Sequence, residues 1–130
     1  DSAKANCLES YCRDEFLGTS AVGALPGAVA ASGALEMVGN VSEWVADWYG
    51  SDYYCNGDAA DTVEPWSYCP VVSSPPSSPW MEPTGPATGS VRVLRGAGYF
   101  GFPVSLRVAF RGFAAPSDPS DDIGFRCCKP

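Results

Sequence analysis

The chain has 130 residues, with 15 acidic and 8 basic side chains, no histidine and a formal net charge of -7. This length suits one domain with a modest core, and the acidic balance argues against nucleic-acid binding while it fits a soluble or cation-binding surface. The 14 glycines and 12 prolines predict a loop-rich chain, and no apolar run reaches the roughly 18 residues of a membrane span.

The six cysteines predict disulfide bonds and an oxidising location: secreted, periplasmic or at the cell surface. The alternative, a zinc site of cysteines alone, lacks the closely spaced cysteine pair typical of such sites. We expect two bridges, Cys7 with Cys12 and Cys55 with Cys69. Cys127 and Cys128 are adjacent and bridge each other only with strain, so at least one is expected to have a distant partner. Because the chain starts at Asp1 without a signal peptide, we expect a processed form of an exported protein.

Residues 5–18, ANCLESYCRDEFLG, gather oxygen-bearing side chains around the first expected bridge. Calcium takes about 6 to 8 oxygen ligands from carboxylates, amides and backbone carbonyls, so this segment suits a calcium site. The alternative is an acidic surface loop closed by a disulfide. The side chains concerned are Asn6, Glu9, Asp14 and Glu15.

Residues 33–49, GALEMVGNVSEWVADWY, combine a turn signal at Gly39-Asn40 with two carboxylates and two tryptophans four residues apart. As a strand or as a helix, it places Trp44 and Trp48 on one face, and we expect both rings to pack in the core. Glu36 and Glu43 lie among apolar residues and therefore need a partner. That partner is either a cation or an arginine, such as Arg95 or Arg107.

Residues 50–89 are the variable middle of the chain, and proline-rich residues 71–89 predict a long extended loop rather than a domain linker. We expect Trp80 to anchor this loop. In the last segment, alternating Val91 and Val93, and again Ile123 and Phe125, predict two core strands.

Several of these stretches together resemble the formylglycine-generating-enzyme (FGE-sulfatase) family. They are residues 33–49, RVLRGAGYF from residue 92, LRVAFR from residue 106 and IGFRC from residue 123. The resemblance implies an α+β, C-type-lectin-like fold of the FGE-sulfatase type, loop-rich with short antiparallel strands. It also implies that residues 1–130 form a single domain equivalent to the C-terminal half of the usual family domain.

The resemblance further implies one or two calcium ions. The first ion would be held by the side chains of Asn6 and Asp14 and the carbonyls of Cys7 and Phe16. The second would be held by Glu36, Glu43 and the carbonyls of Gly39 and Val41, although the family usually has Asp or Asn at position 36. In the family, the cysteine that follows Gly-Phe-Arg bonds to one in the N-terminal half. Here Cys127 would need such a partner, or would pair with Cys128.

Formylglycine-generating enzymes carry a catalytic cysteine pair that binds copper, and related enzymes use a histidine-bound iron. The equivalent stretch here, GYFGFPVSL over residues 98–106, contains no cysteine, histidine or acid. Oxidation that depends on a thiolate cannot proceed without one. We therefore expect no catalytic residues and a calcium-stabilised, disulfide-stapled, secreted or surface binding or structural module. The alternatives are an enzyme completed by a missing N-terminal half or partner chain, and a subunit of a surface or filament assembly.

The expected binding surface consists of the loops over residues 53–90 and 100–105, whose aromatic side chains suit a protein or glycan partner. Packing within the loops is the alternative role for these rings. The chain's own N-terminal half or a second chain is a further expected partner, whereas nucleic acid and a membrane span are not expected. The aromatic residues are Tyr53, Tyr54, Trp66, Tyr68, Trp80, Tyr99 and Phe102.

Overall fold

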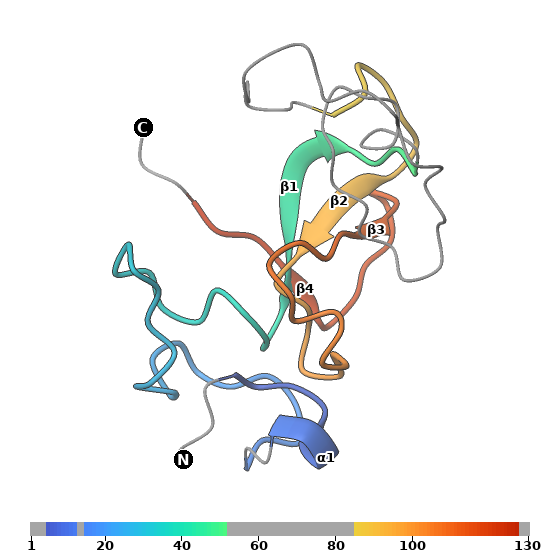
Figure 1. The fold of residues 1–130 in the computed structure, drawn as a ribbon. Helices are drawn as coiled ribbons and strands as arrows, with labels where there is room; N and C mark the ends of the chain where they lie inside the picture. The colour runs from blue at the N-terminus through green and yellow to red at the C-terminus, as the bar shows by residue number, and fades with distance from the viewer. Residues whose placement is uncertain (1–4, 13–14, 52–84, 128–130) are drawn as a thin grey trace, which may run out of the picture.

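The computed structural model describes residues 5–12, 15–51 and 85–127. These ranges contain one single-turn helix, α1 (Glu9–Cys12), and four strands, β1 (Ser42–Trp48), β2 (Arg92–Arg95), β3 (Gly112–Ala114) and β4 (Ile123–Gly124). The strands form one sheet in the order β3-β2-β1-β4 (Figure 1). The rest of the described chain is loop. The fold is therefore made of strands and loops, as predicted, and its helical part is smaller than an α+β fold implies.

Strand β1 settles the ambiguity of the central stretch in favour of a strand. It pairs antiparallel with β2, where Glu43 lies opposite Arg95, and parallel with β4, where Ser42 lies opposite Ile123. The prediction of antiparallel strands is thus wrong for β4. Trp44 and Trp48 both belong to β1 and are half-buried rather than enclosed in the core. The guanidinium group of Arg92 lies over the Trp48 ring, 3.6 Å from its centroid.

The turn that leads into β1 joins three segments of the chain. Gly39 and Asn40 have φ angles of 83° and 71°, a region that favours glycine and tolerates asparagine. The Gly39 N–H donates to the Gly96 carbonyl at 2.7 Å, and the Asn40 N–H donates to the Asn6 carbonyl at 2.7 Å. The Asn40 carbonyl accepts from the Tyr99 N–H at 3.0 Å. This turn, the Gly39–Asn40 turn, therefore ties the N-terminal loop to the loop that follows β2.

The buried apolar core of the described chain is small, and many large apolar side chains lie on its surface. Phe125, which was predicted to face the core, is 78% exposed because β4 ends one residue earlier. Val108 is 86% exposed. The buried apolar residues of the described chain are Cys7, Leu25, Val93, Leu94 and Ala97.

In the ranges that the structure describes, no helix is long and apolar enough to cross a membrane. The expected Cys55–Cys69 bridge, the Trp80 anchor and residues 71–84 of the proline-rich loop lie outside the described residues.

Candidate functional site

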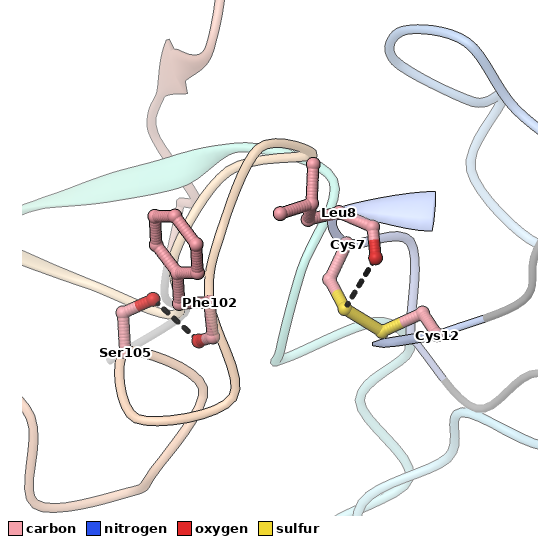
Figure 2. The surroundings of a disulfide bond; sticks show 5 residues. All are labelled: Cys7, Leu8, Cys12, Phe102 and Ser105. Carbon is pink, nitrogen blue, oxygen red and sulfur yellow. Dashed lines mark hydrogen bonds between the residues drawn. A yellow bond between two sulfur atoms is a disulfide. The ribbon is translucent and has the colours of Figure 1, made fainter. Parts of the chain in front are cut away.

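The disulfide between Cys7 and Cys12 is present, as predicted from their spacing, and closes a loop around α1 (Figure 2). The two Cα atoms are 5.5 Å apart. Leu8, inside this loop, donates its N–H to the Gly101 carbonyl at 3.3 Å. The Tyr11 ring meets the Phe102 ring edge-on at 6.2 Å between centroids. The disulfide loop is therefore docked on residues 98–106.

Asn6 is the most informative buried polar residue beside this loop, with a relative exposure of 1%. Its Nδ2 donates to the Gly18 carbonyl at 2.8 Å and to Asn40 Oδ1 at 3.3 Å. Because a backbone carbonyl can only accept, these bonds place Nδ2 toward Gly18 and leave Oδ1 on the other side. Among the described residues, Asn6 Oδ1 is buried and has no hydrogen-bond partner. Such an orphaned oxygen costs about 1–3 kcal/mol unless something else binds it.

A calcium ion fits this orphaned oxygen, because an amide oxygen is one of the ligands that calcium prefers. Cys7 is fully buried next to Asn6, and the chain returns to Asn6 at Gly18, two residues after Phe16, whose carbonyl belongs to the same predicted set. The fourth predicted ligand, Asp14, lies outside the described residues. In the described ranges, no three His, Cys, Asp or Glu side chains gather as metal ligands.

Glu36 is buried, with a relative exposure of 6%, but its carboxylate is already bound by backbone N–H groups. Both carboxylate oxygens accept from the Gly23 N–H at 3.1 Å, and Oε1 also accepts from the Leu25 N–H at 3.3 Å. The backbone of Glu36 has a φ angle of 52°, which is uncommon for a residue with a side chain. Glu36 therefore orders the loop over residues 23–25.

Glu43 forms an ion pair with Arg126, and neither of the arginines named from the sequence, Arg95 and Arg107, takes this role. Arg126 Nη2 lies 2.6 Å from Glu43 Oε1, and Nε donates to both carboxylate oxygens at 3.0 and 3.1 Å. The same guanidinium group donates to the carbonyls of Leu35 at 3.0 Å and Glu36 at 3.2 Å.

These contacts place an arginine, instead of a free cation, beside the residues of the second predicted calcium set. The Arg126 guanidinium lies between the Glu43 carboxylate and the Glu36 carbonyl. The Glu36 side chain is held by N–H groups, and the Gly39 carbonyl accepts from the Val41 N–H at 3.0 Å. As placed, the set formed by Glu36, Gly39, Val41 and Glu43 does not fit a calcium ion, because an arginine supplies the positive charge.

The stretch over residues 98–106 is held by one close glycine contact and by hydrogen bonds within the stretch. Gly98 is buried against Asp122, and a Cβ atom at this glycine would lie 2.8 Å from the Asp122 carboxylate. Gly101 donates its N–H to the Gly98 carbonyl at 2.8 Å, and Ser105 Oγ donates to the Phe102 carbonyl at 2.7 Å (Figure 2). Ser105 Oγ therefore faces a carbonyl and not a general base, which gives no support to a serine nucleophile here.

Two exposed aromatic side chains, Phe100 and Phe102, lie on this stretch. Phe100 and Phe102 are 60% and 57% exposed, and the Tyr99 and Phe100 rings lie 4.2 Å apart between centroids. Tyr99 donates its hydroxyl to Asp121 Oδ2 at 3.3 Å. Partial desolvation, and then the charges of Asp121 and Asp122, raise the pKa of Tyr99.

The remaining aromatic residues of the predicted binding surface lie outside the described residues. They are Tyr53, Tyr54, Trp66, Tyr68 and Trp80.

Two residues central to this region were missed or underused by sequence reasoning. Asn40 Oδ1 accepts from the Ser20 N–H at 2.7 Å, and Asn40 Nδ2 donates to the Ser20 carbonyl at 3.2 Å. The Asn40 side chain thus makes with Ser20 the pair of hydrogen bonds that the backbone of a neighbouring strand would make. Arg126 was not named from the sequence as the partner of Glu43. An asparagine directly after a turn glycine was a usable signal for the first residue, whereas no local signal pointed from Arg126 to Glu43.

Comparison with known proteins gives a consistent picture. The profile of the FGE-sulfatase family, described as "Sulfatase-modifying factor enzyme 1-like domain", matches residues 1–130. A formylglycine-generating enzyme of Streptomyces coelicolor is 34% identical over 98 residues. A serine/threonine-protein kinase pkn1 of Chlamydia pneumoniae is 36% identical over 97 residues. The solved structure of PvdO from Pseudomonas aeruginosa superposes with a TM-score of 0.63 at 34% identity.

The chain spans only part of each of these relatives. The matches cover 73% of this chain and 24% of the Streptomyces enzyme, and 75% of this chain and 13% of the Chlamydia kinase. The PvdO match covers 96% of this chain and 38% of that structure. The shared part is thus found in proteins with different names and larger overall sizes.

Proposed function

Because the chain belongs to the FGE-sulfatase family over residues 1–130, we propose that it is a calcium-stabilised, disulfide-stapled binding or structural module, secreted or at the cell surface. Its fold is the C-type-lectin-like variant typical of this family. It does not generate formylglycine, because residues 98–106 provide no thiol for that oxidation. The aromatic loop over residues 100–105 is the described part of its binding surface, and it suits a protein or glycan partner.

The observation that carries the calcium proposal is the orphaned Oδ1 of Asn6. This oxygen lies beside the disulfide loop and one residue from the Cys7 carbonyl of the same ligand set. Asn6 Oδ1, the Asp14 carboxylate and the carbonyls of Cys7 and Phe16 would hold one ion. Binding there would connect the disulfide loop to the Gly39–Asn40 turn, since the Asn6 backbone already accepts from Asn40. The role is structural, because the ion would hold the disulfide loop, which packs against the aromatic loop over residues 100–105.

Calcium is expected to raise the thermal midpoint of the wild-type chain, and Asp14→Ala is expected to abolish this response. A ligand present at 100 times its Kd adds about 2.7 kcal/mol to the free energy of unfolding if it binds only the folded state. Thermal unfolding in calcium and in chelator measures the difference. The matched control is Asp118→Ala, which removes an exposed acid outside the ligand set and should leave the response intact.

The outcome decides the proposal clearly. A wild-type midpoint that is the same in calcium and in chelator would refute calcium stabilisation. Equal calcium responses in wild type, Asp14→Ala and Asp118→Ala would instead place the ion elsewhere in the chain.

A further inference from the structure

An arginine-lined cavity lies over the sheet and shares no residue with the aromatic loop over residues 100–105. Its volume is about 680 Å³, within the range of roughly 300–1,000 Å³ that ligand sites usually occupy. Its walls are mostly apolar and come from the loop before β1, from β1 itself and from the loop before β3. The apolar residues that shape it include Met37, Val38, Val45, Leu106 and Val108.

The cavity is positively charged, although the chain as a whole has a net charge of -7. Arg95, Arg107 and Arg126 line it together with a single acid, Glu43. Glu43 is neutralised by Arg126, and Arg95 Nη1 donates to the Phe110 carbonyl at 2.6 Å. In the part of the chain that the structure describes, the Arg107 guanidinium makes no hydrogen bond or ion pair. The cavity therefore presents a spare cation to whatever enters it, and guanidinium groups bind carboxylates in a bidentate manner.

In the part of the chain that the structure describes, the edge of β1 beside this cavity is paired only at its start. Strand β4 is two residues long and pairs only with Ser42 and Glu43. Beyond Glu43, no described strand pairs with β1 on this side (Figure 1). Trp44, Val45 and Ala46 belong to this stretch of β1 and also line the cavity, and the Ala46 carbonyl already accepts from the Arg92 guanidinium. An open strand edge with side-chain pockets next to it is a common binding site for extended peptides, which add a strand to the sheet.

From these two features, the unpaired β1 edge and the arginine-lined cavity, we infer that this face binds an extended polypeptide segment that alternates apolar and acidic residues. The acidic side chain pairs with Arg107, and apolar side chains cover Met37 and Val108, which are 43% and 86% exposed. The occupant is a peptide rather than a small acid, because the open edge offers main-chain partners that only a peptide uses. The cavity lining contains none of the residues of the first calcium set or of the aromatic loop over residues 100–105, so the inference can be tested separately from the proposed function.

A fluorescein-labelled peptide, Val-Glu-Val-Glu-Val, is expected to bind the full chain in a fluorescence anisotropy titration at low salt. The same peptide with glutamine in place of glutamate should bind about tenfold more weakly or worse, since the charge-assisted hydrogen bond to Arg107 is lost. Arg107→Gln should cause a similar loss. Arg111→Gln, which removes an arginine that does not line the cavity and lies over the Tyr49 ring, should leave the affinity unchanged.

A second variant guards against a trivial loss of folding. Val108→Glu adds a negative charge to the cavity at a side chain that is already 86% exposed, so it should keep the wild-type thermal midpoint and still weaken binding. The inference is overturned if the acidic and glutamine peptides bind equally, or if Arg107→Gln and Val108→Glu bind as well as wild type. It is also overturned if hexanoate, a small acid without a backbone, displaces the peptide at the concentration at which the peptide competes with itself.

Discussion

Gly39→Ala is expected to lower the free energy of unfolding by about 3–5 kcal/mol, the range of severe single substitutions. Gly39 has a φ angle of 83°, and a Cβ atom here would lie 2.4 Å from the Asn6 carbonyl oxygen and 2.9 Å from the Asn6 nitrogen. Both contacts are with backbone, so no side-chain rotation relieves them. The substitution must therefore push the N-terminal loop away from the Gly39–Asn40 turn.

Gly33→Ala is the matched control for this prediction. Gly33 also has a φ angle of 83°, but a Cβ atom added there meets nothing within 4 Å. It should therefore cost only the left-handed conformation, about 1–2 kcal/mol. Denaturant unfolding measures both variants. Equal losses for the two substitutions would mean that the close approach of Gly39 to Asn6 does not matter for stability.

Asn6→Asp is expected to destabilise the chain by about 3–5 kcal/mol in chelator, a typical effect of an uncompensated buried charge. The side chain is 1% exposed, and the acceptors that Nδ2 now contacts, the Gly18 carbonyl and Asn40 Oδ1, would face a carboxylate. In calcium, most of this loss should be recovered, because the carboxylate is then a metal ligand. Thermal unfolding with and without calcium gives both quantities.

The control for this second prediction is Asn6→Ala, which removes the same hydrogen bonds without adding a charge. It should be destabilised in both buffers and recovered in neither, because it has no oxygen to offer. If calcium rescues Asn6→Ala as well as Asn6→Asp, or rescues neither variant, the Asn6 oxygen is not a ligand.

The features that the sequence predicted correctly are those set by short-range chemistry. The five-residue separation of Cys7 and Cys12 was enough to predict their bridge, and the structure contains it. The Gly39-Asn40 pair marked a turn, and both residues have positive φ angles there. The family was identified from motifs spread over most of the chain, and the family profile covers residues 1–130.

The features that sequence reasoning missed depend on contacts between distant segments. Glu43 was known to need a partner, but Arg126 lies 83 residues away and no local pattern connects them. The alternation of Ile123 and Phe125 predicted a core strand, yet β4 ends at Gly124 and Phe125 is exposed. Alternation shows which residues share a face, but it does not show whether another segment covers that face.

The two predicted calcium sets differ because of contacts between segments that are distant in the sequence. On the sequence alone, both sets offered a carboxylate and backbone carbonyls in similar numbers. The structure leaves Asn6 Oδ1 without a hydrogen bond and places the Arg126 guanidinium beside Glu43. The first set therefore keeps an oxygen for a cation, whereas in the second set the cation is part of the chain.

The most direct test of the calcium-stabilised, non-oxidising module is an elemental analysis of the purified chain for calcium and copper together. The account predicts one calcium per chain and no stoichiometric copper. Absence of calcium would contradict the scaffold proposal, and two calcium ions would mean that Arg126 does not occupy the second set. Stoichiometric copper would contradict the central claim, because it would require cysteine thiols as ligands and would restore an oxidative role.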